Sequence, residues 1–288
     1  MNPSWLAQLP DDFSGPGFAE FLARFTAIAD RWPAHQPAMM RAPEQLSKLE
    51  QDIEVEQLAL IRSWFSDVPV LTEEYFKSTG EIVEGRGRLS VVLDPLDGSA
   101  SYLRGSARYA VSLAFLIDGV TTVAFVYPPA TGLMRSAYAG HGAWVGAQPL
   151  RHRPEYRRKI VAVKVQHLDK ESVRTRADRL TARGYKLERM ESTSLKLCWV
   201  AEGRRAGIVK WLSERAGVTQ EWGTTAGALI CREAGIEART FDGEIWHRQS
   251  GGLVIADAQC EADLGYAAPV GEGLNQHGRP STHEDAGR

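Results

Sequence analysis

Two aspartates and a serine follow directly on a short apolar run. Residues 89–93 read as a buried strand, which ends in the segment DPLDGS. Its carboxylates, Asp94 and Asp97, are the ligands that hard cations such as Mg²⁺ prefer, and Mg²⁺ sites usually include a phosphate group. Gly98 lets the backbone approach a ligand closely, and Ser99 can cap a following helix whose free amide groups attract phosphate. The segment predicts a metal-dependent phosphate site.

The same segment has a simpler interpretation, because Asp, Pro, Gly and Ser are the usual residues of turns. Both interpretations fit the segment when it is taken alone. A phosphatase of the haloacid dehalogenase type would place one residue between its two aspartates, the first of which is the nucleophile. Here Pro95 and Leu96 intervene, so a covalent aspartyl-phosphate mechanism is disfavoured.

The segment 68–75 is a second short apolar run that ends in carboxylates, Glu73 and Glu74. Two strands that carry acids at their ends can bring metal ligands together at one point of a scaffold. We expect Glu73 to join the metal cluster and Glu74 to begin a solvated turn. Upstream, residues 46–65 have the apolar spacing of an amphipathic helix, and the acids near its start fit the helix dipole.

The other elements are predicted from apolar periodicity and from the positions of Gly and Pro. We expect a helix over residues 17–32, a sheet with hairpins over 68–150, and alternating strands and helices from residue 160 onward. This alternation favours parallel or mixed strand pairing with helices on the sheet faces. The predicted organisation is an N-terminal helix and linker (1–45), an α+β subdomain that binds metal and phosphate (46–150), an α/β substrate subdomain (151–268) and a disordered tail (269–288).

Length and composition agree with a globular protein of one large or two closely packed domains. The chain has 288 residues, a formal net charge of −2 and 43% hydrophobic residues. The near-neutral charge predicts no general attraction to a nucleic-acid polymer. The three cysteines lack metal-ligand spacing and fit reduced thiols. Because the sequence has neither a secretory signal pattern nor an apolar run of membrane-spanning length, we expect a cytoplasmic protein.

The chain resembles a known family at three places. The DPLDGS loop with its upstream Glu-Glu pair is similar to the metal site of the inositol monophosphatase-like superfamily of Mg²⁺-dependent, lithium-sensitive phosphatases. Residues 109–150 resemble the strands that follow this loop in the family. Residues 192–209 and 219–235 resemble the branch of 3′(2′),5′-bisphosphate nucleotidases. The resemblance covers about residues 46–258, most of the chain.

This resemblance implies a fold and a set of metal ligands. The fold is α/β (α+β), a layered αβαβα sandwich of the type shared by inositol monophosphatases and fructose-1,6-bisphosphatases. The implied ligands of Mg²⁺ are Glu73, Asp94, Asp97 and the backbone carbonyl of Leu96. Mn²⁺ is an alternative metal, and the resemblance implies inhibition by Li⁺.

The resemblance also implies a catalytic set of Asp52, Glu73 and Ser99, in which Glu73 is a metal ligand as well. Gly98 and Ser99 are expected to bind phosphate through their amides. In the family, a hydroxyl at the position of Ser99 works with a helix aspartate to orient the attacking water. Asp52 is the best match for that aspartate, and Glu50 is a competing assignment because the family threonine before the aspartate is absent.

The substrate pocket is predicted from the second half of the chain. Thr193, Ser194 and Lys196 are implied to line it, with Lys196 neutralising phosphate as a point charge. A Ser-Thr-Ser string before an apolar helix is also an ordinary N-cap, which leaves a second interpretation open. The arginine that family members use for a substrate phosphate has no clear counterpart; Lys210 and Arg215 are the two candidates.

One departure from the family pattern bears directly on chemistry. Where the family has Trp-Asp, this chain has Trp222 followed by Gly223. That aspartate normally holds a second metal ion, and glycine offers no carboxylate. The loss should weaken the second ion, although Mg²⁺ accepts water in place of protein oxygens. We do not expect Glu221 to compensate, because the intact family pattern contains the same glutamate.

These observations predict a phosphoric monoester hydrolase in which a metal-activated water attacks without a covalent intermediate. The preferred substrate is a 3′-phosphorylated adenine nucleotide, followed by an inositol or sugar phosphate. The alternative, motivated by Gly223, is an impaired family member that binds a phosphorylated ligand without efficient turnover. The expected partner is a small phosphorylated metabolite, with no membrane span, and a homodimer is compatible with the resemblance.

Overall fold

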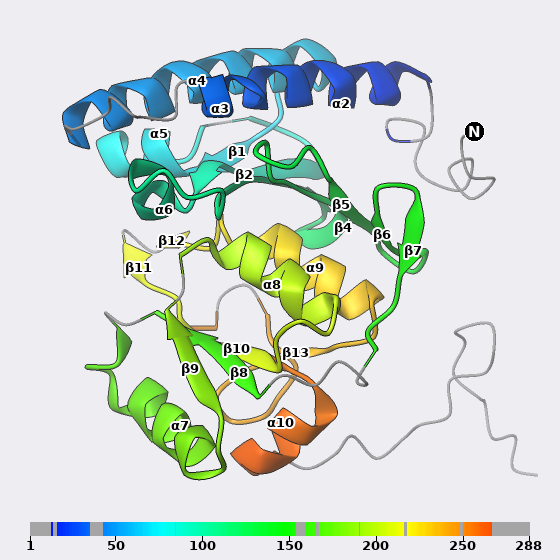
Figure 1. Ribbon diagram of the computed structural model, residues 1–288. Coiled ribbons are helices and arrows are strands. Elements are labelled where there is room, and N and C mark those ends of the chain that lie inside the picture. Colours follow the sequence, from blue (N-terminus) through cyan, green and yellow to red (C-terminus); the bar gives the residue numbers. More distant parts are fainter. Residues whose placement is uncertain are drawn as a thin grey trace, which may run out of the picture.

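The computed structural model of the chain describes residue 13 and residues 16–34, 43–83, 85–153, 159–164, 167–189, 191–215, 218–247 and 250–266. These residues form five layers in the order helices, sheet, helices, sheet, helices (Figure 1). The predicted αβαβα sandwich is therefore confirmed. The predicted tail (269–288) and most of the predicted N-terminal linker lie outside the described residues.

The first sheet has seven strands that pair in the order of the sequence. Only its first pair is parallel; the other pairs are antiparallel. Its central strands are buried along most of their length, because helices cover both faces. The strands are β1 (Val70–Thr72), β2 (Leu89–Asp97), β3 (Ala110–Ile117), β4 (Val120–Tyr127), β5 (Arg135–Tyr138), β6 (Gly142–Val145) and β7 (Gln148–Leu150).

The second sheet has five strands in the order β13-β14-β10-β8-β9. Strand β8 pairs in parallel with both of its neighbours, and the pairs made by β14 are antiparallel. The mixed pairing agrees with the predicted alternation of strands and helices. The strands are β8 (Ile160–Val163), β9 (Lys186–Arg189), β10 (Gly207–Trp211), β13 (Ala238–Arg239) and β14 (Gly252–Ala256), and a separate hairpin is formed by β11 (Glu214–Arg215) and β12 (Val218–Thr219).

Helices cover each sheet on both faces (Figure 1). Every residue of the middle-layer helix α8 is buried, since a helix between two sheets has no solvent face. The outer helices are α2 (Pro16–Ala29), α3 (Arg31–Ala34) and α4 (Pro43–Trp64) on the first sheet and α7 (Glu171–Ala182) and α10 (Ala258–Leu264) on the second; the middle layer holds α8 (Thr193–Ala201) and α9 (Thr225–Glu233).

Two short helices follow the first two strands directly: α5 (Glu73–Thr79) after β1 and α6 (Ser99–Leu103) after β2. The helix predicted over 17–32 is present as α2 and α3, and α4 begins three residues before the predicted position 46. No helix within the described ranges combines the length and apolar character needed to cross a membrane.

Candidate active site

The carboxyl ends of β1 and β2 bring three acids to one cavity. The strands are parallel and Thr72 pairs with Leu93, so Glu73, directly after β1, lies beside Asp94 of β2. They line a cavity of about 350 Å³ together with Asp97. This convergence is what the two acidic strand ends predicted.

A bulge in β2 turns both aspartates to the same side. Residues three apart in a regular strand would face opposite sides of the sheet. Asp94 pairs with Ser112 and Asp97 with Ala110, so β2 advances three residues while β3 advances two. Pro95, which has no N–H for the ladder, lies inside this irregular stretch. The extra residue aims both carboxylates at the cavity edge.

Asp94 is buried, and the neighbouring Glu73 is partly exposed. Burial raises the pKa of Asp94 well above its usual range, and the charges of Glu73 and Asp97 raise it further. Burial also raises the pKa of Glu73. Two acids this close need either a shared proton or a cation between them.

A lysine supplies one positive charge at this point. The Lys77 ammonium lies 2.7 Å from Glu73 Oε1 and 2.8 Å from Glu74 Oε1, and Lys77 also lines the cavity. The expectation that Glu74 begins a solvated turn is wrong. Glu74 is buried, because the chain continues into α5 and brings Lys77 back over the same helix face.

Asp97 is turned toward the middle layer of the fold. Its Oδ2 accepts hydrogen bonds from Ser192 Oγ at 2.8 Å and from the amide and hydroxyl of Ser194, both at 2.6 Å. Its Oδ1 accepts from the amide of Thr193 at 3.1 Å. These groups begin helix α8, whose N-terminus attracts a negative charge. Ser194, which was predicted to line the substrate pocket, therefore donates hydrogen bonds to Asp97.

The turn into α6 has a conformation that suits glycine. Gly98 has φ 110°, and a Cβ there would lie 3.0 Å from the carbonyl oxygen of Arg108. The amides in the first turn of a helix have no acceptor within the helix. Gly98 and Ser99 line the cavity, so the predicted phosphate-binding amides lie beside the acids.

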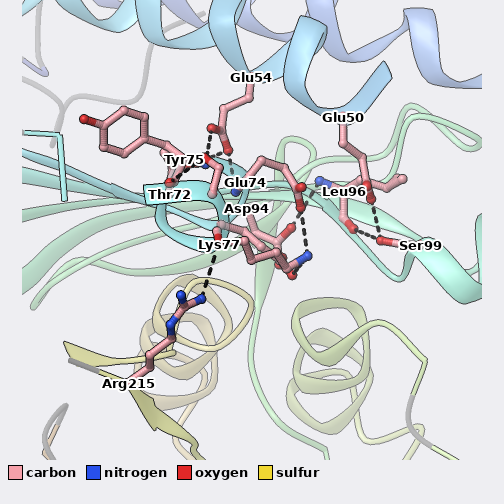
Figure 2. A network of polar contacts seen from close by, with 12 residues as sticks. Glu50, Glu54, Thr72, Glu74, Tyr75, Lys77, Asp94, Leu96, Ser99 and Arg215 are labelled. Atoms are coloured by element: carbon pink, nitrogen blue, oxygen red, sulfur yellow. Dashed lines mark hydrogen bonds and ion pairs between the residues drawn. The ribbon is translucent and has the colours of Figure 1, made fainter. Parts of the chain in front are cut away.

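The helix acid that meets Ser99 is Glu50. Ser99 Oγ donates to Glu50 Oε1 at 2.6 Å (Figure 2). Burial raises the pKa of Glu50 to about 7. Asp52 lies on the exposed side of α4, since two residues rotate a helix by about 200°. The preferred assignment of Asp52 is therefore corrected in favour of the competing one.

A second acid of α4 positions the first metal-ligand candidate. Glu54 accepts hydrogen bonds from Thr72 Oγ1 at 2.6 Å and from the amides of Glu74 and Tyr75 at 2.9 and 2.8 Å (Figure 2). It fixes the start of α5, where Glu73 stands. This role was not predicted from the sequence, although Glu54 follows Glu50 by one helical turn.

The second half of the chain brings two lysines to the cavity. Lys164 and Lys210 line it together with His167 and Glu191. The Lys210 ammonium donates to Thr193 Oγ1 at 3.2 Å and to Thr224 Oγ1 at 2.8 Å, and burial lowers the pKa of Lys210 to about 8. Of the two candidates for a missing arginine, Lys210 lies in this cavity. His167 had no assigned role, and burial lowers its pKa to about 4.

Two other predicted or candidate cations lie elsewhere. The Lys196 ammonium is buried 2.6 Å from Glu188 Oε2 and lies over the Trp199 ring, away from the cavity lining. The predicted contact of Lys196 with substrate is contradicted, because Lys196 lies in α8 and its ammonium pairs with Glu188 of β9. Arg215 is exposed and donates to the carbonyl oxygen of Lys77 at 3.3 Å (Figure 2).

Gly223 stands next to the aspartates. A Cβ at this position would lie 3.0 Å from Asp94 Oδ2 and 3.0 Å from Asp97 Oδ1. A side chain here would enter the cavity, whereas glycine contributes none. The Glu221 side chain accepts from Thr225 Oγ1 at 3.1 Å and lines a different pocket, so it does not replace the missing carboxylate.

The donor set fits one divalent ion better than two. Glu73 and Asp94 are adjacent acids, and Mg²⁺ often takes one or two carboxylates and completes its shell with water and phosphate. Over the described ranges, no group of three or more His, Cys, Asp or Glu side chains has an arrangement suited to a metal ion. Asp97 accepts hydrogen bonds from the start of α8, and Glu73 forms an ion pair with Lys77.

Comparison with known proteins gives the same architecture. A profile described as the inositol monophosphatase family matches residues 41–273. The Nus factor SuhB of Vibrio cholerae is 28% identical over 217 residues, which cover 73% of this chain and 77% of that protein. The 3′(2′),5′-bisphosphate nucleotidase CysQ of Shigella flexneri is 29% identical over 187 residues, covering 64% and 71%. The Thermotoga maritima IMPase superposes with a TM-score of 0.70 at 18% identity, covering 86% and 96%.

Proposed function

We propose that this chain, which belongs to the inositol monophosphatase family, hydrolyses a small phosphate monoester with the help of Mg²⁺. The observation that carries the proposal is the grouping of three features in and next to one cavity. These are the Glu73–Asp94 pair, the turn at Gly98 and the hydrogen bond from Ser99 to Glu50.

The proposed roles follow from the chemistry of each group. Glu73, Asp94 and the carbonyl of Leu96 would hold one ion, which supplies Lewis-acid stabilisation of the phosphate and makes water a better nucleophile. The amides of Gly98 and Ser99 bind the phosphate oxygens in a position close to the acids. Binding the phosphate there orients it for direct attack by water, with no covalent intermediate.

Ser99 and Glu50 form the proposed water-orienting pair. The Ser99 hydroxyl gives its proton to the hydrogen bond with Glu50, so its lone pairs are free to accept an O–H of the attacking water. The proton lost by the water passes through Ser99 toward Glu50. A carboxylate with a pKa of about 7 is well matched to this task near neutral pH.

The two lysines support a substrate with a second anionic group. Lys164 and Lys210 line the same cavity as Gly98 and Ser99. With one phosphate bound at Gly98, the charge of a second phosphate of the same molecule would be neutralised by these lysines. We therefore place a 3′-phosphorylated adenine nucleotide first, as the notation 3′(2′),5′-bisphosphate of a relative also suggests. An inositol or sugar phosphate is the second choice.

Phosphate release from adenosine 3′,5′-bisphosphate and from inositol 1-phosphate, with Mg²⁺ or with EDTA, tests the proposal. We expect Mg²⁺-dependent release, faster for the bisphosphate, and loss of release in Asp94→Asn. Asp178→Asn is the matched control, because Asp178 is exposed on α7. Absence of release from both substrates would refute the hydrolase proposal.

Gly223 favours a second candidate function, a protein that binds a phosphorylated ligand and turns it over slowly. The name Nus factor SuhB, carried by a relative, also specifies no reaction. The variant Gly223→Asp would place a carboxylate beside Asp94 and Asp97. If the natural protein is slow and the variant gains Mg²⁺-dependent activity of about tenfold or more, the binding function is favoured; a fast natural protein excludes it.

A further inference from the structure

Lys77 occupies a position where its charge acts directly on the proposed ion site. Helix α5 begins at Glu73, so Lys77 lies one turn later on the same face. Its ammonium is 2.7 Å from Glu73 Oε1, the distance of a charge-assisted hydrogen bond. A second contact of 2.8 Å joins the same ammonium to Glu74 Oε1.

The ammonium competes with metal ions for the same oxygen. An oxygen that accepts a short bond from an ammonium has less electron density to offer a cation. A divalent ion bound near Glu73 would also meet the repulsion of the lysine charge at short range. One ion can still use Asp94, because the ion pairs of Lys77 within the described ranges are those with Glu73 and Glu74.

The other groups that could bind a second ion are either absent from this chain or engaged in other hydrogen bonds. Gly223 provides no side chain, although its Cα stands beside Asp94 and Asp97. Asp97 is held by hydrogen bonds from the first residues of α8. The position that a second ion would need is therefore short of carboxylates and close to a fixed positive charge.

We propose that Lys77 is a tethered cation that takes the place of one divalent ion, so that the cavity binds a single ion. The ammonium balances Glu73 in the absence of that ion and keeps the acid at the cavity edge. The inference rests on the proposed function for the catalytic role of the remaining ion, but ion binding is measurable without turnover.

A purely structural role for Lys77 makes a different prediction. A Glu–Lys pair four residues apart, with Glu nearer the N-terminus, stabilises a helix by about 0.2–0.5 kcal/mol. If this were its whole role, removing Lys77 would lower stability slightly and leave ion binding unchanged. Ion stoichiometry and affinity are therefore the measurements that separate the two roles.

Calorimetric titration with Mn²⁺ alone tests the proposal on the full chain. The natural protein should bind one ion, and Lys77→Met should bind a second ion or bind the first about tenfold or more tightly. Lys77→Arg, which keeps the charge, and Lys186→Met, at an exposed site on β9, should behave like the natural protein.

The outcomes separate the inference from the proposed function. Two ions in the natural protein, or unchanged binding in Lys77→Met, would overturn the role of Lys77 and leave the proposed hydrolysis intact. No Mn²⁺ uptake by any variant would overturn both. Thermal unfolding of each variant shows whether the fold is retained, and Lys77→Gln serves if Lys77→Met does not fold.

Discussion

Replacing Glu50 by glutamine should have opposite effects on stability and on catalysis. Glu50 is 6% exposed, and burial raises its pKa from 4.5 to about 7. Between these values the folded chain binds more protons than the unfolded chain, so the free energy of unfolding falls as the pH rises. At about 1.4 kcal/mol for each unit of pKa, the complete loss is about 3 kcal/mol.

Glutamine keeps the shape of the side chain and removes its charge. Its amide oxygen can still accept the hydrogen bond from Ser99. In EDTA, the natural protein should therefore lose up to about 3 kcal/mol more than Glu50→Gln between pH 5 and pH 8. Urea denaturation at both pH values, followed by tryptophan fluorescence, measures this difference. Asp52→Asn, on the exposed side of the same helix, should track the natural protein.

The catalytic effect has the opposite sign. A neutral amide accepts no proton, so Glu50→Gln should lower kcat by about 100-fold or more at pH 8. KM should change much less, because Glu50 lies outside the residues that line the cavity. The reasoning is refuted if Glu50→Gln keeps both its pH-dependent stability and its kcat. A loss of kcat in Asp52→Asn alone would restore the first assignment.

Two further predictions concern the lysines of the second half. Burial lowers the pKa of Lys210 to about 8, so this lysine loses its charge as the pH rises through that value. The affinity for adenosine 3′,5′-bisphosphate, measured by calorimetry in EDTA, should fall between pH 7 and pH 9. Lys210→Met should bind this ligand about tenfold more weakly at pH 7 and lose most of the pH dependence. If the natural protein and Lys210→Met show the same affinity at each pH, a contact between Lys210 and the ligand is contradicted. Lys196→Met should lower the free energy of unfolding by about 1–3 kcal/mol, because it removes a buried ion pair with Glu188, and should leave KM unchanged; a raised KM with normal stability would restore the predicted substrate contact.

The sequence was sufficient to predict where the acids meet. An apolar run that ends in carboxylates predicts a strand end, and two such runs predicted the β1–β2 edge with Glu73 and Asp94. The αβαβα layering was implied by the family resemblance, and the alternation of elements predicted the mixed pairing with helices on the sheet faces. Both predictions depend on local patterns that tertiary structure leaves unchanged.

The orientation of side chains was harder to predict. Asp52 and Glu50 differ by two positions, and only the packed angle of α4 decides which one meets Ser99. Lys77 was missed because the sequence pattern did not indicate that α5 begins at Glu73. Lys196 was placed in the pocket from its motif, whereas the rotation of α8 between two sheets directs it to Glu188.

Asp97 links the binding of an ion to the position of the first residues of helix α8. Its carboxylate belongs to the first half of the chain, yet it holds the first residues of a helix in the second half. An ion that draws this carboxylate further into the cavity must weaken those bonds, which changes how the start of α8 is held, where Thr193 Oγ1 accepts from Lys210. The binding of metal and the binding of substrate should therefore be coupled. Each ligand should change the affinity for the other by the same factor.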